Sequence, residues 1–411
     1  MKVSELAGKK ILIAGYGIEG KATMEYLNKF APTAQVEKAD REDGPGYLDN
    51  QREYDIVIRS PGIPLDQIHT PHTTATNIFF ANLDSRHTTI GVTGSKGKST
   101  TSSLIAHILS VSGKNVRLVG NIGKPMLESL LNPSEDAIIF VIELSSYQLE
   151  DCTFSPHISV CTSLFPEHIP HHKTLAQYYA AKQHIVLSAI PEDYFVYNPN
   201  FEEFVAWTKS TRAKSIPFGT DIQPPYTPLL GEHNESNVRG AVTVSRLMGI
   251  SDALAYKAIK TFQPLPHRLQ EVGTYKGITF IDDAISTAPE STIAAIHALP
   301  NTSCIFLGGE DRGYDFQELA RILKKCNITY VVLFPDSGAR IKKALEAEGL
   351  ENWTVCETSS MEEAVQFAYR NTSETSICLL STASPSYSLW KDYIHKGNEF
   401  QEFVKQYGEK N

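Results

Sequence analysis

The sequence predicts an α/β protein of three domains, and three observations support this prediction. The chain has 411 residues, more than a single hydrophobic core usually serves. Short apolar runs alternate with helical segments, as in parallel sheets covered by helices on both faces. A pattern of strand, glycine turn and helix occurs three times along the chain, once at the start of each domain. These restarts place the boundaries near Arg86 and Leu265 and give the domains 1–86, 87–264 and 265–411.

The composition is that of a globular protein and excludes several classes of function. Hydrophobic residues make up 41% and charged residues 21% of the chain, and the net charge of −9 argues against nucleic acid or an anionic membrane as a partner. No apolar run reaches 18 residues, and the amino terminus lacks the apolar region of a signal peptide. The six cysteines are scattered without metal-binding spacing. We therefore expect a cytoplasmic protein with reduced thiols. We also expect a monomer, although nothing in the composition fixes the oligomeric state.

The first domain begins with an apolar strand, Lys10–Ala14, that ends in Gly15 and Gly17 and leads into a helix to about Phe30. A second apolar strand at 55–59 ends in the turn "SPGIP". Ligands of such a unit bind at the carboxyl ends of its strands. The two glycines alone are weak support for a nicotinamide cofactor, because no convincing G-x-G-x-x-G with a following acidic residue accompanies them.

The second domain opens with a strand at 88–93 that runs into "GSKGKSTT" and a helix. Glycines in this context turn backbone N–H groups toward an anion, and the helix amino terminus adds its positive end. Lys98 would reach the β- and γ-phosphates of a nucleotide, and the Ser99 hydroxyl would bind Mg²⁺. Val92 stands where the common motif has its first glycine. The alternative interpretation is a polar turn before a surface helix.

Two later segments carry groups suited to an ATP–Mg²⁺ site. Glu143 ends an apolar strand, where a carboxylate needs a metal or hydrogen bonds, and His168 follows the next strand. The alternatives are a charge near a helix N-cap for Glu143 and a solvated loop histidine for His168. Lys182 lies on a helical segment, and by itself it reads as a solvated surface residue. Because Glu143 and His168 follow successive strands, they favour a ligand site at one sheet edge.

The third domain follows the proline-bearing segment "FQPLPHRLQ", which is suited to a linker. Its strands are expected at 277–283, 302–309, 328–334 and 376–381, with a charged helix at 315–325. The alternation predicts a second sheet of the Rossmann type.

Taken together, these segments resemble the Mur ligases, the ATP-dependent enzymes that add amino acids in peptidoglycan synthesis. The resemblance covers essentially the whole chain. "GVTGSKGKSTT" is similar to the family's phosphate loop, "GNIG" at 120–123 to its next signature, and "ELSSYQLE" and "EHIPHH" to its metal-binding segments. "YYAAK" matches the segment whose lysine the family carbamylates, which overturns the surface interpretation of Lys182. "GEHNESN" and "LPHR" match its adenine-side elements, and "SPGIP" fits its UDP-binding amino-terminal domain.

The resemblance implies a reaction and its site residues. ATP would phosphorylate the carboxylate of UDP-N-acetylmuramoyl-L-alanine, and the amine of glutamate would displace the phosphate, a step in cell-wall biogenesis and hence in cell shape and division. Lys98, His168 and Lys182 would be catalytic, with one Mg²⁺ on Ser99 and Glu143 and a second on His168 and carbamylated Lys182. ATP would contact Gly94, Ser95, Lys96, Gly97, Lys98, Ser99, Thr100, Asn234, Asn237, Arg268 and Asp283. Substrates would contact Gly15, Gly17, Ser60, Pro61, Gly62, Asn121, Ser145, Gln148, Thr287, Arg312, Ser386 and Tyr393.

The amino-acid pocket departs from the family pattern. The family commonly reads Asn-Asp-Ser-Lys-Ala-Thr-Asn, but Ile285 occupies the lysine position here. Isoleucine cannot pair a carboxylate, whereas Arg312 could grip one with both arms of its guanidinium. We expect D-glutamate as the amino acid that is added, because the family commonly uses it. The segment around Ile285 also resembles a subgroup that adds L-glutamate, which stays the alternative.

Two further classes of protein compete with this interpretation. Folylpolyglutamate synthase shares the central fold but normally lacks the separate amino-terminal domain that "SPGIP" indicates. A nucleotide-binding scaffold without activity would be expected to have lost Lys98, Glu143, His168 or Lys182, and all four are present.

Overall fold

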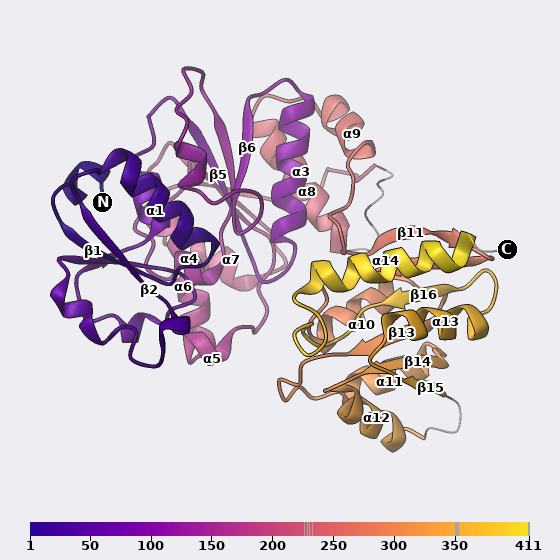
Figure 1. Cartoon of the computed structure of the whole chain (residues 1–411). Helices are drawn as coiled ribbons and strands as arrows, with labels where there is room; N and C mark the ends of the chain where they lie inside the picture. Colours follow the sequence, from indigo (N-terminus) through magenta and orange to yellow (C-terminus); the bar gives the residue numbers. More distant parts are fainter. Residues whose placement is uncertain (226, 228, 230, 232, 350–352, 410–411) are drawn as a thin grey trace. The chain divides into compact units, whose positions relative to one another are not determined.

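The computed structural model describes residues 1–409 apart from 226, 228, 230, 232 and 350–352. It contains three sheets, one of four strands and two of six. The chain forms two compact units, residues 1–227 with 233–262 and residues 228–232 with 263–411. The first unit holds two of the sheets and the second unit holds the third (Figure 1). Among the described residues, no helix is long and apolar enough to cross a membrane.

The amino-terminal sheet has the strand order β2-β1-β3-β4, and all its pairs are parallel. Its inner strands β1 and β3 are apolar and almost wholly buried, as expected for strands covered on both faces. The elements of this part are β1 (Lys10–Ala14), α1 (Ile18–Phe30), β2 (Gln35–Ala39), β3 (Ile56–Arg59), β4 (His72–Thr73) and α2 (Ala75–Ala81). Short 3₁₀ turns lie at Val3–Leu6, Arg41–Asp43, Asp49–Glu53 and Leu65–Gln67.

The central sheet has the order β10-β9-β8-β5-β7-β6 and is parallel throughout. Helix α3 packs against β5, β6 and β7, with α8 and α9 against its outer side (Figure 1). A 3₁₀ turn lies at Glu128–Leu130. The elements are β5 (Thr88–Thr93), α3 (Lys98–Val111), β6 (Val116–Gly120), β7 (Ile139–Glu143), α4 (Ser146–Leu149), β8 (Ile158–Cys161), α5 (Ile169–His172), α6 (Leu175–Leu187), β9 (Tyr194–Tyr197), α7 (Glu202–Trp207), β10 (Lys214–Pro217), α8 (His233–Leu247) and α9 (Asp252–Lys260).

These two sheets share one hydrophobic core. The ring of Phe79 in α2 meets the ring of Phe140 in β7 edge to face, with centroids 5.3 Å apart. Buried residues of both sheets belong to the same apolar cluster. The amino-terminal domain predicted at 1–86 therefore forms part of a larger compact unit, and its boundary stays a prediction.

The third sheet has the order β11-β12-β16-β13-β14-β15. Its strands are parallel except β11, which pairs antiparallel with β12. Along β13 the side chains alternate between two apolar clusters, with Phe306 packing toward α13 and α14 and Leu307 toward α10 to α12. The elements are β11 (Gln270–Tyr275), β12 (Ile278–Asp282), α10 (Pro289–Ala298), β13 (Thr302–Gly308), α11 (Gln317–Lys325), β14 (Tyr330–Phe334), α12 (Gly338–Ala347), β15 (Thr354–Glu357), α13 (Met361–Asn371), β16 (Ile377–Leu380) and α14 (Tyr393–Glu409).

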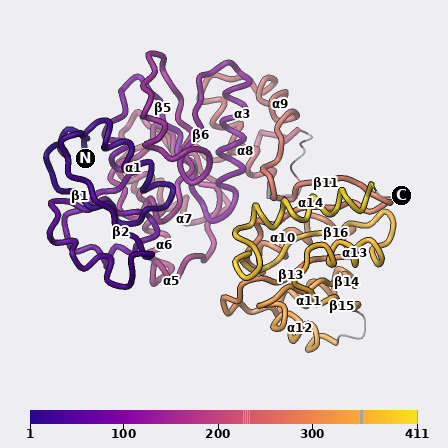
Figure 2. Tube along the Cα trace, viewed as in Figure 1, coloured from indigo at the N-terminus to yellow at the C-terminus, as the bar shows by residue number. Residues whose placement is uncertain are grey.

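The predicted fold class is confirmed, and every strand expected from an apolar run is present. The tube in Figure 2 shows the same alternation of strand and helix in both units. The sequence interpretation did not predict the short strands β2, β4, β9, β10 and β15, nor the antiparallel β11. The division between the compact units falls at Phe262, inside the predicted linker segment. All six cysteines are free, as expected.

Candidate active site

The phosphate loop joins β5 to α3 in a conformation that requires its glycines. Gly94 and Gly97 have φ angles of 154° and 83°. A Cβ on Gly94 would lie 2.1 Å from the Thr162 hydroxyl, and a Cβ on Gly97 would lie 2.4 Å from Asn237. The loop therefore packs against its surroundings so closely that only glycine fits at either position. It ends at the amino terminus of α3, where backbone N–H groups can bind an anion.

Residues outside the motif hold this loop in place. The Ser95 hydroxyl lies 2.9 Å from Tyr178 Oη, and it donates to the Phe165 carbonyl. The hydroxyls of Thr162 and Ser163 both donate to the Lys96 carbonyl, at 2.6 and 2.9 Å. Ser95 is buried, so its side chain braces the loop rather than facing a ligand.

Two lysines meet at the start of the loop. Lys98 Nζ and Lys182 Nζ each donate to the Gly94 carbonyl oxygen at 2.8 Å. Lys182 lies on α6 and is 1% exposed, so its interpretation as a solvated surface lysine is wrong. Burial, followed by the Lys98 charge, lowers the pKa of Lys182 well below its usual value. This shift favours the neutral form of the Lys182 amine.

Glu143 is the last residue of β7, as the sequence predicts, and it is 1% exposed. Its Oε1 accepts a hydrogen bond from Asn121 Nδ2 at 2.9 Å, while its buried Oε2 has no hydrogen-bond partner among the described residues. A buried carboxylate oxygen without a partner costs free energy unless a cation or donor meets it. The neighbouring strand β5 leads into the phosphate loop. Glu143 therefore fits a ligand of a metal bound beside that loop.

His168 lies at the amino end of α5 with a left-handed φ of 56°. Its Nδ1 lies 3.0 Å from Tyr147 Oη. Desolvation is the largest effect and lowers the pKa of His168 to about 4; the Glu167 charge opposes it, and the Lys98 charge adds to it. The ring is therefore neutral at physiological pH, the form in which histidine binds metals.

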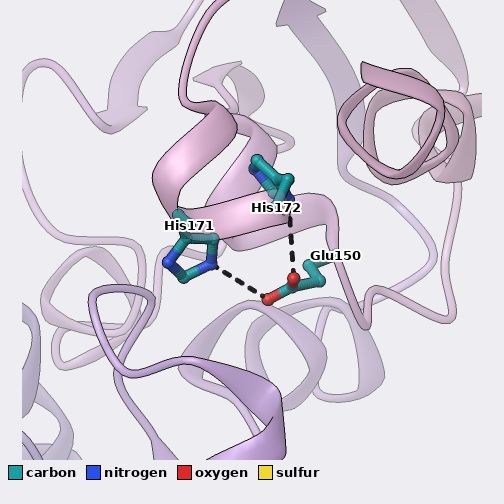
Figure 3. A group of neighbouring side chains, drawn as sticks. All are labelled: Glu150, His171 and His172. Carbon is teal, nitrogen blue, oxygen red and sulfur yellow. Dashed lines mark hydrogen bonds and ion pairs between the residues drawn. The ribbon is translucent and has the colours of Figure 1, made fainter. Parts of the chain in front are cut away.

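Glu150, His171 and His172 form a cluster next to this site (Figure 3). His171 Nε2 lies 3.3 Å from Glu150 Oε2, and His172 Nδ1 lies 3.5 Å from Glu150 Oε1. The three ligand atoms would fit around a metal ion, since they lie within 4.8 Å of one another. However, the buried Arg59 guanidinium lies 3.4 Å from the same carboxylate and already balances its charge. We interpret the cluster as a brace that holds α5 against α4.

A hollow of about 240 Å³ lies at the carboxyl ends of β1, β2 and β3. Four of the predicted UDP-site residues line it, namely Gly15, Gly17, Ser60 and Gly62, whereas Pro61 does not. Its other walls come from residues that the sequence interpretation did not select: Ile18, Glu19, Gly20, Asp40, Arg41, Tyr47 and Ile63.

The glycine turn at this hollow is more complete than the sequence interpretation recognised. Gly15, Gly17 and Gly20 give the full G-x-G-x-x-G spacing, and Asp40 follows β2. A Cβ on Gly20 would lie 2.2 Å from the Gly15 carbonyl oxygen, so helix and strand meet closely there. Asp40 accepts a hydrogen bond from the Tyr16 backbone N–H and thereby fixes the turn.

Ser145 and Gln148, which are predicted to face the substrate, form hydrogen bonds with each other. They form a capping box at the start of α4, in which each side chain accepts from the other residue's backbone N–H. The Gln148 side-chain amide is left to donate to Glu19 Oε2 at 3.2 Å. The predicted adenine-side residues Asn234 and Asn237 are buried and bonded to each other, and Asn237 packs under Gly97. Glu232 of the same segment lies outside the described residues.

The second unit holds the remaining predicted residues. The buried Asp283 accepts from the Leu269 N–H and the Ser381 hydroxyl, and desolvation raises its pKa to about 6. Arg268 Nε and Ser386 Oγ are buried without hydrogen-bond partners among the described residues. Arg312 is exposed and pairs with Glu310 at 2.8 Å. The predicted residues Thr287 and Tyr393, together with Ile285, are half-buried in this unit.

Comparison with known proteins gives the family. Residues 92–226 match the Mur ligase middle domain, and residues 267–384 match the Mur ligase, glutamate ligase domain. A UDP-N-acetylmuramoyl-L-alanine–L-glutamate ligase of Salinispora tropica is 35% identical, and the match covers 98% of this chain and 99% of that protein. The chain belongs to the Mur ligase family.

More distant relatives agree with this assignment. A UDP-N-acetylmuramoylalanine–D-glutamate ligase of Streptococcus agalactiae is 29% identical to this Mur ligase, over 97% of each chain. The solved structure of MurF ligase from Thermotoga maritima in complex with ADP has a TM-score of 0.64 at 15% identity, covering 98% of this chain and 97% of that one. At that identity the likeness shows the fold alone.

Several residues of this Mur ligase site were missed by reasoning from the sequence. Thr162, Ser163 and Tyr178 hold the phosphate loop, and Tyr147 contacts His168. Lys96, predicted to contact ATP, forms an ion pair of 2.6 Å with Glu167, and its contact with ATP stays a prediction. Threonine, serine and tyrosine occur too widely for a single sequence to mark these positions. Asp40 had a detectable signal, because it is the acidic residue that follows the complete glycine fingerprint, whereas Glu19 occupies a variable position of it.

Proposed function

We propose that this Mur ligase uses ATP to join glutamate to the carboxyl group of UDP-N-acetylmuramoyl-L-alanine, in the cytoplasm, as a step of peptidoglycan precursor synthesis. The observation that carries the proposal is the phosphate loop, where Lys98 and the buried Lys182 meet at one carbonyl oxygen. The two relatives are named as glutamate ligases that act on this nucleotide, which supports the choice of substrate.

The chemistry needs two steps. A carboxylate oxygen of the alanine attacks the γ-phosphorus of ATP, releasing ADP and forming an acyl phosphate. The amine of glutamate then attacks the acyl carbon, and the tetrahedral intermediate expels inorganic phosphate to leave the amide. Lys98, now bonded to Gly94 and Ser95 carbonyls of its own loop, is placed to turn toward the phosphates and to stabilise the charge that develops there.

The residues present fit Mg²⁺ beside the loop. Ser99 and Glu143 would hold one ion, because Ser99 lies in the first turn of α3 and Glu143 Oε2 is buried without a hydrogen-bond partner among the described residues. His168 and a carbamylated Lys182 would hold a second. Bound there, Mg²⁺ supplies positive charge for the phosphate oxygens. Asn121 orients Glu143 through its 2.9 Å hydrogen bond.

Carbamylation of Lys182 is consistent with its surroundings. The reaction joins the lone pair of a neutral amine to the carbon of CO₂ and releases a proton, so it requires an uncharged lysine. Burial of Lys182 favours that form. The product is a carboxylate, which would replace a cation beside Lys98 by an anion suited to a metal.

The remaining predicted residues divide between the substrates. Gly15, Gly17, Ser60 and Gly62 would receive the uridine diphosphate in the hollow that they line. Asn121, Ser145 and Gln148 would contact the sugar and alanine, and Asn234, Asn237, Arg268 and Asp283 would contact ATP. Thr287, Arg312, Ser386 and Tyr393 would contact the incoming amino acid.

The configuration of the glutamate has two candidates. The D isomer is the expectation from the family pattern, and it stays a prediction. Two observations favour the L isomer, namely Ile285 in place of the lysine and the name of the relative with 35% identity. A pocket that lacks the lysine must hold the side-chain carboxylate by other groups.

The experiment is a measurement of ATP-dependent phosphate release with UDP-N-acetylmuramoyl-L-alanine and D-glutamate, L-glutamate or D-aspartate. Release that requires both the nucleotide and one isomer of glutamate supports the proposal and identifies the isomer. Absence of release with both isomers, from protein that still binds ATP, would overturn it.

A further inference from the structure

His168 stands beside the phosphate loop, and two tyrosine rings face it. Its side chain is exposed and lies at the amino end of the short helix α5, so the backbone alone leaves the ring free to turn. The ring centroids of Tyr147 and Tyr178 lie 5.0 and 6.0 Å from that of His168. Lys182 Nζ lies 4.8 Å from the centre of the Tyr178 ring, and Tyr178 Oη lies 2.9 Å from Ser95 Oγ of the loop. His168 and Lys182 therefore share a neighbour at the loop.

The two ring nitrogens of His168 have different surroundings. Nδ1 lies 3.0 Å from Tyr147 Oη, whereas Nε2 has no hydrogen-bond partner among the described residues. A neutral imidazole carries one proton and one lone pair, and a metal binds the lone pair. If Nδ1–H donates to the Tyr147 oxygen, the lone pair lies on Nε2. If instead the Tyr147 hydroxyl donates to Nδ1, Nε2 carries the proton and cannot bind a metal.

Tyr147 is itself held in place by the cluster of Figure 3. It lies on α4, and its ring meets that of His171 with centroids 4.2 Å apart and that of His172 with centroids 5.4 Å apart. Both histidines pair with Glu150, which ends α4 (Figure 3). The Tyr147 hydroxyl is thus a fixed point, against which the ring of His168 can be set.

Where a histidine binds a metal through one nitrogen, the other nitrogen almost always donates to an oxygen, and this bond fixes the tautomer and the orientation of the ring. We propose that Tyr147 is the positioning residue of His168: with Mg²⁺ bound, its hydroxyl oxygen accepts the Nδ1 proton, so that Nε2 is the metal ligand. This inference rests on the proposed function, because it takes His168 to hold the second Mg²⁺. Tyr147 acts through His168 and not on the reacting atoms.

NMR spectroscopy tests the tautomer directly. A long-range ¹H–¹⁵N spectrum of protein with ¹⁵N-labelled histidine shows which ring nitrogen carries the proton. The protein is loaded with Mg²⁺ and a non-hydrolysable ATP analogue in CO₂-equilibrated buffer, and the signals of His168 are those that His168→Gln lacks. We expect His168 of the wild-type protein to be protonated on Nδ1. Protonation on Nε2 would mean that Tyr147 donates, and it would overturn the proposal.

Metal binding supplies a second test that does not depend on turnover. Tyr147→Phe keeps the ring and its packing but removes the oxygen. Titration with Mn²⁺ in the presence of the same analogue, followed by the EPR signal of the free ion, measures the ions bound. We expect wild-type protein to bind two ions and Tyr147→Phe to bind the weaker one about tenfold less tightly, the lower end of the usual effect of such a partner.

The matched control is Tyr179→Phe, which removes the hydroxyl of a half-buried tyrosine on α6 and should bind both ions as wild type does. Thermal unfolding checks that each variant folds. Equal binding of both ions by Tyr147→Phe and wild-type protein would overturn the proposal. So would an equal loss in Tyr147→Phe and Tyr179→Phe, because the effect would then not be specific to the contact with His168.

The outcomes separate this role from the proposed ligation. If phosphate release fails while the tautomer and the metal binding are as expected, the ligation is overturned and the role of Tyr147 stands. If His168→Gln binds both ions as tightly as wild-type protein, His168 is not a metal ligand, and the role of Tyr147 is overturned even when phosphate release is normal.

Discussion

Lys98 and Lys182 donate hydrogen bonds to the same acceptor, the carbonyl oxygen of Gly94, each at 2.8 Å. One lysine opens α3 and the other lies on α6, so two helices converge on the first residue of the phosphate loop. Two full positive charges at one neutral oxygen repel each other, particularly where Lys182 is buried. The arrangement therefore favours an uncharged Lys182 and leaves Lys98 as the cation for phosphate.

Replacement of Lys98 by alanine should abolish activity without unfolding the protein. Lys98 is half-buried, and two of its hydrogen bonds are to carbonyls of its own loop, so thermal unfolding is measured beside activity to check that the variant folds. We expect phosphate release to fall by at least about 100-fold, the usual scale for loss of a charge that stabilises a transition state. Lys114→Ala, an exposed lysine after the same helix, is the control. Normal turnover in Lys98→Ala would contradict the assignment of the loop.

Lys182 should carry a carbamate when CO₂ is present. A ¹³C NMR spectrum of protein equilibrated with ¹³C-bicarbonate should show one carbamate signal that Lys182→Met lacks. Methionine is close in length and suits a buried position, so the variant should fold while its ligation activity is lost. A spectrum without a carbamate signal in wild-type protein would rule out the modification.

Replacement of Glu143 by glutamine should weaken metal binding specifically. The amide keeps the size of the side chain but removes the charge from the oxygen that has no partner. We expect the Mg²⁺ concentration for half-maximal phosphate release to rise by about tenfold or more, with a smaller change in the KM for ATP. Glu128→Gln, on a short 3₁₀ turn in the same domain, serves as the control. An unchanged Mg²⁺ dependence would remove Glu143 from the metal site.

The sequence predicted the parts of the fold that have a strong local signal. Apolar runs such as 139–143 and 302–308 are buried on both faces and read clearly as strands. The edge strands β2 and β10 are largely exposed, so they carry no apolar run. The joint core of the first two sheets depends on contacts such as that of Phe79 with Phe140, which lie far apart in the chain and leave no local pattern.

The same distinction holds for the candidate site. Glycines and lysines of the phosphate loop are recognisable because their spacing is set by the phosphates that they would bind. The burial of Lys182 could not be read from its helix, since the tertiary packing around α6 decides it. Thr162 and Tyr178 act only through contacts made after folding. Asn234 and Asn237 came from the family pattern, and the structure places them beneath the loop.

Arg59 should be important for the stability of the first compact unit. Its guanidinium is fully buried and pairs with Asp151 and Glu150, which lie in the central part of the unit, while Arg59 itself ends β3. Replacement by alanine leaves two carboxylates without their cation, at a cost of about 3–5 kcal/mol in the free energy of unfolding. Urea denaturation measures it, with the exposed Arg52→Ala as the control. A loss below about 1 kcal/mol would show that solvent replaces the pairing.

Ile285 offers the sharpest test of how the amino acid is chosen. Suppose that the isoleucine marks a pocket altered for L-glutamate. Ile285→Lys then restores the cation that the family uses, and it should raise kcat/KM for D-glutamate relative to L-glutamate. We expect the ratio to rise by about tenfold, the effect of one well-placed ion pair. Ile285→Met keeps the volume without the charge and should leave the ratio unchanged. Ile285 is half-buried and its backbone N–H bonds to the His267 carbonyl, so either side chain can be accommodated without breaking that contact. An equal gain for both isomers would mean that the lysine only attracts carboxylates and that other residues select the configuration. Ser386 is a candidate, because its buried hydroxyl has no hydrogen-bond partner among the described residues.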